Sequence, residues 1–395
     1  MINNFFDIDT EFNFEKEKEN FINNLDMLKS MSVQEQTLYK KWQEFNKDEK
    51  IRIKFRKNYR KAELMYNRIW KPTDITDKEL TISEIEKLDP IVEYTDDNET
   101  WTILRTLISS MEFTANPGRN IKFFAKDSIT GKYLGVISVG SDVTSIKVRD
   151  DYIKWTKDNK FVDHKLNHTC IGTSIVPTQP LGFNFLGGKL LSALVTTSTI
   201  RDKWYENYNE ILVGVTTTSL YGVHSQYNGI PHWKTLGEST GKVSIKPDDS
   251  VYKPWVEWMK DERADDFKKI MTPKEGVNGP PTGVKQQILG YIFRELGIRK
   301  ADYDHGYKRG IYFSMFYENG KEYLQNKIDD SDLIMRKKFA EGYHYINKWW
   351  KRKAIKRYTK LHSEGRLKPE ILYYSDILGM TWEEAKEKYL GDVGR

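Results

Sequence analysis

The 395-residue chain has a single cysteine, Cys170, and lacks any apolar run of about 18 residues, the length that a membrane-spanning helix needs. One cysteine excludes an internal disulfide framework and a zinc site built from several cysteines. The short apolar runs and a mean hydropathy of −0.68 exclude a transmembrane helix. Residues 1–20 contain six acidic residues and no apolar segment, unlike a secretory signal. We therefore expect a cytoplasmic protein without a membrane partner.

Charge is distributed unevenly along the chain, although its total is only +6. Residues 336–366 contain eleven Lys and Arg against two Glu, a net charge of +9, which leaves −3 for the rest of the chain. A basic segment on a mildly acidic body indicates a polyanionic partner. We expect that partner to be DNA.

The centre of this basic segment predicts a helix with two different faces. Trp350, Tyr358 and Leu361, together with Ala354 or Ile355, recur every three to four positions and should pack inward. Cations on the outer face could contact phosphates without reading the base sequence. The alternative is a solvated face without a partner. The predicted nucleic-acid-binding residues are Lys348, Lys351, Arg352, Lys353, Lys356, Arg357 and Lys360.

Changes in composition divide the chain into four regions. Residues 1–94 are predicted to be mainly helical, since glycine and proline are absent from residues 12–70. The other predicted regions are an α/β core at 95–245, a mixed insert or loop region at 246–330 and a basic helical region at 331–395.

The core contains two recognisable supersecondary patterns. Strands at 121–125 and 133–139, joined through a turn at Thr130-Gly131-Lys132, predict a β-hairpin. A strand at 169–176, a glycine-rich turn, an amphipathic helix at 190–208 and a strand at 210–217 follow. That order is an α/β crossover, whose two strands should lie parallel or splayed side by side.

The glycine-rich turn of residues 179–189 is the most informative local feature. A strand that enters a helix through glycines exposes backbone N–H groups at a positive helix end, which suits phosphate or pyrophosphate. The glycine spacing matches neither the P-loop nor the dinucleotide-binding fingerprint. A plain structural turn is the alternative. The candidate cofactor-binding residues are Gln179, Gly182, Gly187, Gly188 and Lys189.

Polar side chains gather in the sequence just after the strand at 210–217. Ligands sit at strand ends in open α/β sheets, and a histidine flanked by tyrosine hydroxyls can relay a proton. An Arg-Asp pair earlier in the core could join them, or it could form a local ion pair or loop anchor. Its arginine could also clamp a phosphate. The alternative is that these groups only hydrogen-bond loop backbone. The candidate catalytic residues are Tyr221, His224, Tyr227, Arg149 and Asp150.

A divalent metal is a further open possibility, and no metal ligand is assigned. His168 and His224 could ligate a metal together with Asp142 or Asp150, but their spacing does not require it. The residues by themselves do not identify a cofactor, and a divalent metal stays open.

The strand, turn, helix and strand of residues 169–217 resemble the acyl-CoA-binding core of the GNAT N-acyltransferase fold. That fold places a Gln/Arg-x-x-Gly-x-Gly/Ala turn on the cofactor pyrophosphate. Gln179 and Gly182 match this pattern, Asn184 occupies the second glycine position, and Gly187 and Gly188 come later. The resemblance implies an α/β (α+β) fold, with a GNAT-like mixed sheet and helical extensions at both ends. It also adds an acyl donor to the cofactors that stay open, beside a divalent metal.

A wider stretch, residues 133–243, contains several short motifs: Leu134–Ser138, Arg149-Asp150, Tyr152-Ile-x-Trp155, Asn167-His168, Gln226–Trp233, Leu236-Gly237 and Thr240-Gly241. With these motifs the stretch resembles the DruA-like family that is associated with Druantia anti-phage systems. The phage Mom protein, which acts on adenine in DNA, also resembles the GNAT fold. Together these resemblances imply a phage- or defence-related DNA-acting protein. It would be either a Mom-like base-modifying transferase or a non-catalytic DNA-binding protein with a degenerate acyltransferase fold.

Overall fold

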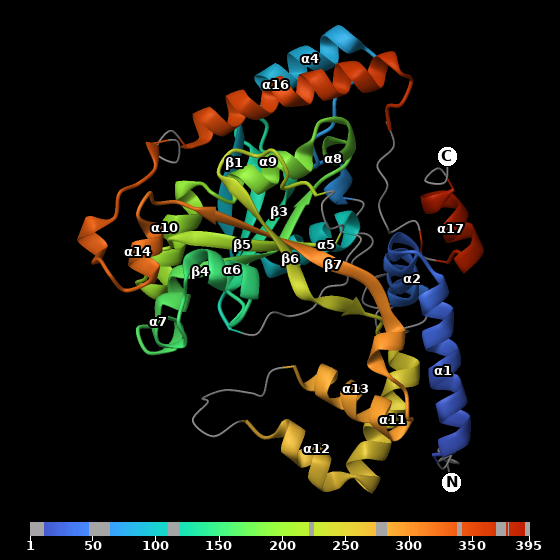
Figure 1. Ribbon diagram of the computed structural model, residues 1–395. Helices are drawn as coiled ribbons and strands as arrows, with labels where there is room; N and C mark the ends of the chain where they lie inside the picture. Colours follow the sequence, from blue (N-terminus) through green and yellow to red (C-terminus); the bar gives the residue numbers. More distant parts are fainter. Residues whose placement is uncertain are drawn as a thin grey trace, which may run out of the picture. The chain divides into compact units, whose positions relative to one another are not determined.

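The chain folds into two compact units, each assembled from segments that are distant in the sequence. Unit 1 comprises Met1–Lys40 with Lys242–Tyr307, and unit 2 comprises Lys41–Gly241 with Lys308–Arg395 (Figure 1). The computed structural model describes residues 12–46, 64–109, 118–220, 225–273, 283–337, 342–368, 377 and 379–391.

Unit 1 is a helical assembly around an aromatic core. Phe21 packs edge-on against Trp255 with a centroid separation of 6.0 Å, and it lies 5.9 Å from the ring of Phe293. The Asp248 carboxylate accepts a hydrogen bond from Asn24 Nδ2 at 2.8 Å, which joins the first helix to the start of another. Its helices are α1 (Phe14–Ser30), α11 (Asp249–Glu262), α12 (Ala264–Met271) and α13 (Val284–Glu295), and α2 (Val33–Asn46) runs from this unit into unit 2.

Unit 2 is built on a seven-stranded mixed sheet in the order β1-β2-β3-β4-β5-β7-β6. The pairs among β1, β2, β3 and β4 are antiparallel, β4 and β5 are parallel, and β5 and β7 are antiparallel. The predicted mixed α/β fold, the β2–β3 hairpin and the parallel pair are thereby confirmed. The strands are β1 (Pro90–Thr95), β2 (Asn120–Asp127), β3 (Tyr133–Ser141), β4 (Thr169–Pro177), β5 (Gly214–Ser219), β6 (Trp233–Ser244) and β7 (Asp304–Met315).

The two parallel strands part soon after they pair. Their register runs only from Thr169 opposite Gly214 to Ile171 opposite Thr216. A bulge in β4 at Thr173 shifts its register against β3 immediately afterwards. Because a bulge bends its own strand, it accounts for the separation of β4 from β5 toward their carboxyl ends.

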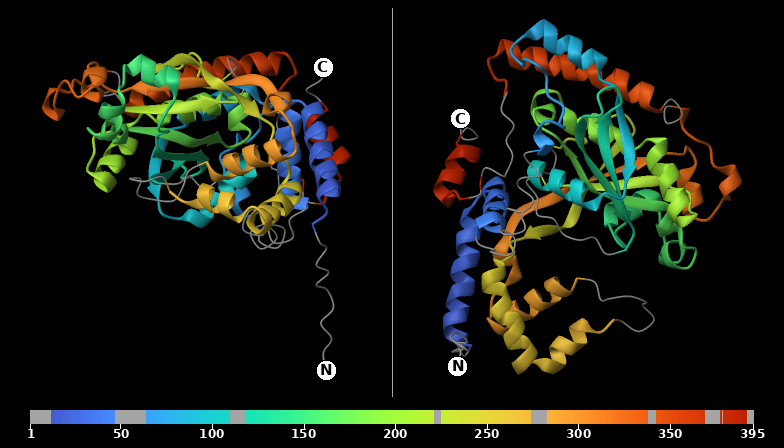
Figure 2. Two further views of the ribbon diagram at one scale, coloured as in Figure 1. Left: turned by 60° about the horizontal axis from the view of Figure 1, so that its bottom comes forward. Right: turned by 180° about the vertical axis from the view of Figure 1, so that it is seen from behind.

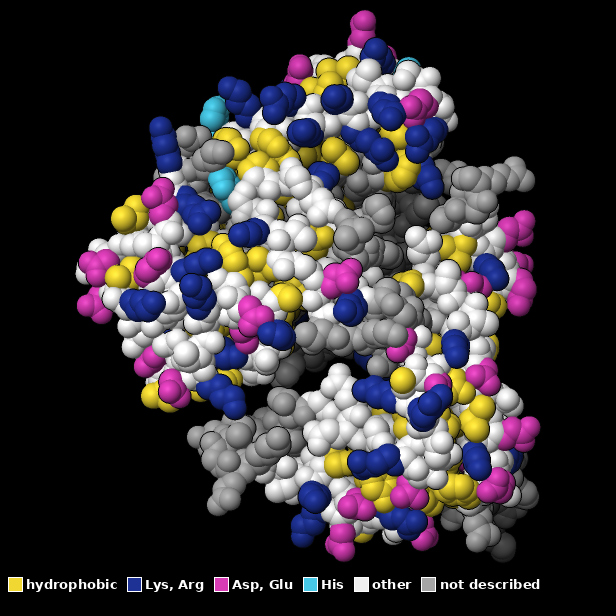
Figure 3. Space-filling model, viewed as in Figure 1, with side chains coloured by type: hydrophobic (Ala, Val, Ile, Leu, Met, Phe, Trp, Pro, Cys, Tyr) yellow, Lys and Arg dark blue, Asp and Glu magenta, His cyan; other side chains and the backbone are white. Residues whose placement is uncertain are grey.

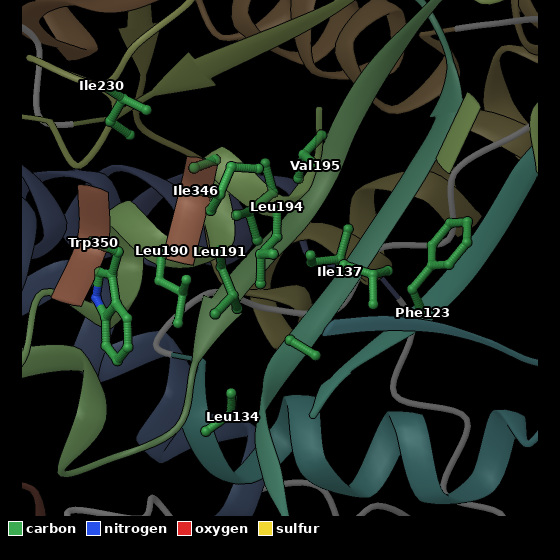
Figure 4. Packing of buried hydrophobic residues seen from close by; sticks show 14 of the residues in the cluster. Phe123, Leu134, Ile137, Leu190, Leu191, Leu194, Val195, Ile230, Ile346 and Trp350 are labelled. Atoms are coloured by element: carbon green, nitrogen blue, oxygen red, sulfur yellow. The ribbon is translucent and has the colours of Figure 1, made fainter. Parts of the chain in front are cut away.

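Helices cover both faces of the sheet, as the alternation of β2 side chains requires. Phe124 faces the helix α5 (Asn98–Ile108), whose Trp101 donates from Nε1 to the carbonyl of Phe123 at 3.2 Å. The Phe123 side chain instead joins Leu191 and Leu194 on the opposite face (Figure 4). The helices of unit 2 include α4 (Lys78–Lys87), α5 (Asn98–Ile108), α6 (Lys147–Ile153), α7 (Lys157–Phe161), α8 (Leu181–Asn184), α9 (Gly187–Leu194), α10 (Ser198–Tyr208), α14 (Gly320–Leu324), α16 (Gly342–Ser363) and α17 (Trp382–Leu390).

The single helix predicted for residues 190–208 was wrong, since two helices occupy this stretch. α9 ends where the hydroxyls of Thr196 and Thr197 donate to the carbonyls of Ala193 and Leu194, at 2.7 and 2.8 Å. Thr197 is extended, with ψ of 161°, and α10 starts after it. Side chains that hydrogen-bond to the last turn compete with helix continuation, and apolar periodicity does not reveal this competition.

The helix α16 packs along α4 and over α8 and α9 (Figures 1 and 2). Its Trp350 donates from Nε1 to the carbonyl of Phe185 at 2.9 Å, and its Tyr358 hydroxyl donates to the carbonyl of Ile75 at 2.8 Å. Trp350, Ala354, Tyr358 and Leu361 are all fully buried. The inward face predicted for this helix is thereby confirmed.

Among the described helices, none combines the length and the apolar character that crossing a bilayer requires.

Replacing Tyr358 by Phe should lower the free energy of unfolding of unit 2 by about 1 kcal/mol, because the Ile75 carbonyl is left without its buried donor. Tyr205→Phe is the matched control, since the Tyr205 side chain is 53% exposed and its replacement should cost less than about 0.5 kcal/mol. Urea unfolding followed by tryptophan fluorescence measures both. Equal effects of the two substitutions would show that the Tyr358 hydrogen bond does not hold α16.

Candidate functional site

Two residues of the glycine-rich turn, Gln179 and Gly182, use their hydrogen-bonding groups for bonds to neighbouring backbone. Gln179 Oε1 accepts the backbone N–H of Phe183 at 3.1 Å, and the Gly182 N–H donates to the Thr178 carbonyl at 2.8 Å. The side chain of Gln179, which we predicted to bind a cofactor, thus caps the first turn of α8. These contacts give Gln179 and Gly182 a structural role within the turn.

Asn184 ties the turn to the segment that follows α16. Its Nδ2 donates to the Lys368 carbonyl at 2.8 Å, and its Oδ1 accepts the Lys368 N–H at 3.0 Å. Asn184 is fully buried. The residue that stands at the second glycine position of the acyltransferase pattern therefore joins two distant segments of the chain.

The second half of the turn contacts the loop that contains Tyr227. A Cβ added to Gly188 would lie 2.5 Å from Gln226 Oε1, and Gln226 Nε2 donates to the Ile175 carbonyl at 3.1 Å. Lys189 Nζ donates to the Asn228 carbonyl. The structure therefore brings Gly188, Lys189 and the Tyr227 loop together at the carboxyl end of β4.

Tyr227 is a buried aromatic residue within this group. Its ring lies 5.3 Å from the rings of both Trp233 and Tyr312. Burial raises the pKa of the Tyr227 hydroxyl, which favours its protonated form. Tyr221 and His224, the other candidates in this loop, lie outside the described residues.

Arg149 and Asp150 lie at the opposite end of β4, in a buried ionic network. Arg149 Nη1 is 2.7 Å from Asp142 Oδ1, and Arg149 Nη2 is 2.7 Å from Asp150 Oδ1. Lys160 Nζ lies 2.7 Å from the second Asp150 oxygen, and the Thr216 hydroxyl donates to Asp142 at 2.7 Å. Asp142 follows the end of β3, which pairs with the start of β4. The predicted ion pair is confirmed, and it is separated along β4 from Tyr227.

The electrostatics of this network favour an internal anchor. Burial raises the pKa of the Asp142 carboxyl, while Arg149 opposes that shift. Arg149 is fully buried and is already occupied by two carboxylates, which fits poorly with a phosphate clamp. The same carboxylates already face cations, which fits poorly with metal ligation. Within the described part of the chain, no three His, Cys, Asp or Glu side chains gather as a metal site would require.

His168 forms a separate contact near the start of β4. Its Nδ1 lies 2.9 Å from the Ile211 carbonyl and 3.2 Å from the Tyr323 hydroxyl. Burial lowers the pKa of His168 and raises the pKa of Tyr323. Tyr323 comes from α14, 155 residues later, so nothing in local sequence indicates this pairing.

The seven predicted cations of α16 form a surface that we call the cationic ridge. Figure 3 shows Lys and Arg side chains gathered over this helix. Lys351 Nζ donates to the Glu86 carbonyl at 2.8 Å, and Lys360 lies 3.7 Å from Glu364. In the described chain, the other five have no carboxylate within 4.0 Å: Lys348, Arg352, Lys353, Lys356 and Arg357.

The cationic ridge meets the glycine-rich turn at Phe183. The Arg357 guanidinium lies 5.2 Å from the centroid of the Phe183 ring, and Lys368 Nζ lies 5.0 Å from it. Burial lowers the pKa of Lys189, and the nearby charge of Lys353 lowers it further. The predicted cofactor-binding and nucleic-acid-binding residues thus border one another.

Comparisons with known proteins agree with one of the resemblances in the sequence. The family model described as "Druantia protein DruA" matches residues 33–326. The chain is also 25% identical over 283 residues to the Druantia protein DruA of Escherichia coli (strain UMEA 4076-1), covering 65% of this chain and 67% of that protein. No solved structure matches the chain.

The buried ionic network predicts that the stability effects of substitutions at Arg149 and Asp142 are coupled. Arg149→Met should lower the free energy of unfolding by about 3 to 5 kcal/mol, because the buried Asp142 carboxylate loses its guanidinium partner. Adding Asp142→Asn removes that uncompensated charge. The double variant should therefore be more stable than the sum of the single effects predicts.

Guanidinium unfolding of the wild type, both single variants and the double variant measures this coupling. Strict additivity would contradict the role of Arg149 as partner of Asp142.

Proposed function

Since this chain belongs to the DruA family, we propose that it is a DNA-binding component of a cytoplasmic anti-phage defence system. The cationic ridge would contact the phosphate backbone. The observation that carries this proposal is the set of five ridge cations without a carboxylate within ion-pair distance in the described chain. Phosphate contacts of this kind supply affinity that does not depend on the base sequence.

The way in which α16 is held supports the proposal. Trp350 and Tyr358 bury one face of the helix, so its cations stay on the opposite face. A rigid helix presents its charges in fixed positions, which reduces the entropic cost of binding. The absence of nearby carboxylates among the described residues also leaves the field of these cations largely unopposed.

The border with the glycine-rich turn extends the proposed contact surface. Lys189 is close enough to Lys353 of the ridge for the charge of Lys353 to lower its pKa. Lys368 lies over the Phe183 ring, which also contacts Arg357 of the ridge. We propose that a phosphate near this border would contact cations from both segments. Lys189 would then bind nucleic acid instead of a cofactor pyrophosphate.

A GNAT-like core is the second part of the proposal. The mixed sheet and the crossover from β4 through α9 and α10 to parallel β5 support it. The inward use of Gln179 and Asn184 within the chain favours a degenerate version of that core over one that holds an acyl donor. Binding without turnover is therefore the function that the geometry supports best.

A base-modifying transferase is the second candidate, and one observation favours it. β4 carries a bulge at Thr173, next to the point where it parts from β5, and bulges are frequent beside active sites. Such an enzyme would take its base outside the double helix or from a single strand. Mass spectrometry of nucleosides from cells that express the protein tests this candidate. An altered base that disappears with Tyr227→Phe would favour the enzyme, and unaltered DNA would favour the binder.

The DNA-binding proposal predicts a change in salt dependence. Replacing Lys351, Arg352, Lys356 and Arg357 by Gln should flatten the plot of log affinity against log salt by roughly 0.9 for each phosphate that the helix no longer neutralises. The matched control carries Gln at four lysines outside α16 that have no ion pair in the described chain: Lys132, Lys157, Lys269 and Lys327.

Fluorescence anisotropy with a labelled duplex of about 30 base pairs, between roughly 50 and 200 mM salt, measures both slopes. An unchanged affinity and slope for the ridge variant would remove the proposed role of α16.

A further inference from the structure

Three lysines from three different elements lie close together beside Tyr152, on the helix α6 that also carries Arg149 and Asp150. Lys321 Nζ of α14 lies 3.7 Å from the centroid of the Tyr152 ring, and Lys234 Nζ of β6 lies 4.5 Å from it. Lys154, which ends α6 in the left-handed conformation with φ of 62°, is close enough to influence Lys321 electrostatically. We call Lys154, Lys234 and Lys321 the lysine triad.

The lysine triad has a net excess of positive charge. In the described chain, no carboxylate lies within 4.0 Å of any of its three ammonium groups. Burial lowers the pKa of Lys321, the charges of Lys234 and Lys154 lower it further, and Glu322 opposes these effects. Lys154 and Lys234 therefore raise the free energy of the charged form of Lys321, and the contact of Lys321 with the face of the Tyr152 ring offsets part of this cost.

The surrounding fold keeps the three elements in place. The Tyr152 ring packs against Phe313 of β7 at a centroid separation of 6.3 Å. α14 is held by the buried Leu324, whose carbonyl accepts Trp155 Nε1 at 2.6 Å. Because buried contacts position Tyr152 and α14, the gathering of the cations is a property of the packed fold.

An anion at this place would relieve the mutual repulsion of the lysines. Ammonium groups bind phosphate as point charges from several directions and need no bidentate geometry. Lys154 and Lys234 are exposed, so a large polyanion can reach them. A nucleic-acid phosphate satisfies these requirements.

We propose that the lysine triad is a second contact for a backbone phosphate of bound nucleic acid, separate from the cationic ridge. This inference rests on the proposed function, because it assigns the phosphate to the same DNA. It identifies a binding site that the pattern of charge along the sequence does not indicate.

Amine reactivity tests occupancy of the triad directly. A lowered pKa leaves more neutral amine, so Lys321 should react faster with sulfo-NHS-acetate at about pH 8 than the control Lys132. Saturation with a duplex of about 30 base pairs should protect Lys321 and Lys234 at least about fivefold and leave Lys132 unchanged. Peptide mass spectrometry of the full chain reports each site.

The same labelling experiment with pyrophosphate in place of DNA distinguishes a nucleic-acid phosphate from a small phosphate ligand. Protection by DNA at a concentration where pyrophosphate gives none supports the proposal. Protection by pyrophosphate alone would overturn it in favour of a small phosphate ligand. If neither protects Lys321, the triad binds no phosphate and the proposal is also overturned.

A triple variant measures the contribution to affinity. Replacing Lys154, Lys234 and Lys321 by Gln should raise the DNA dissociation constant by about tenfold at roughly 0.1 M salt for each phosphate that is no longer neutralised, and it should make the salt slope shallower. Replacing Lys132, Lys268 and Lys269 by Gln is the control with the same change in charge.

The outcomes separate this inference from the proposed function. If the wild type binds DNA but the triad variant matches the control, the inference fails and the cationic ridge stands. If the wild type binds no DNA, the proposed function fails, and this inference fails with it.

Discussion

The packing of one face of α16 is the constraint on which the proposed nucleic-acid surface depends. Trp350 and Tyr358 are fully buried, and each donates a hydrogen bond to a backbone carbonyl outside the helix. A helix with so many like charges is weakly stable alone, because like charges at neighbouring turns repel. Burial of its aromatic side chains supplies the compensating free energy, of the order of 1.5 to 3 kcal/mol for each large side chain. The same contacts hold the cations outward.

This arrangement gives the glycine-rich turn a different role from the one that its sequence first indicates. Gln179 caps α8, Asn184 binds the segment after α16, and Phe185 accepts a hydrogen bond from Trp350. A pyrophosphate loop needs its N–H groups and side chains free for a ligand. Here Asn184 and Phe185 hold α16 and the segment after it, which agrees better with the proposed DNA-binding surface than with a pocket for a cofactor.

Features of the fold that depend on local sequence were predictable, and features that depend on distant contacts were not. β-branched runs around Thr130-Gly131-Lys132 predicted the hairpin, and the three-to-four spacing of Trp350 and Tyr358 predicted the buried face of α16. The break between α9 and α10 escaped prediction because it depends on threonine side chains that bond back to the helix.

The candidate site was predictable only in part, since the burial of Arg149 with Asp142 depends on the pairing of β3 with β4. The meeting of Lys353 with Lys189 and the gathering of the lysine triad likewise arise from topology, which residue spacing does not encode.

The central claim is that DNA lies against α16 where it borders the glycine-rich turn. Formaldehyde crosslinking of the full chain to duplex DNA, followed by mass mapping of the linked lysines, tests it most directly. The account predicts crosslinks at Lys353, Lys356 and Lys189, with competition by unlabelled DNA and disappearance at high salt. Crosslinks confined to the helices of unit 1, with those three lysines unmodified, would contradict it.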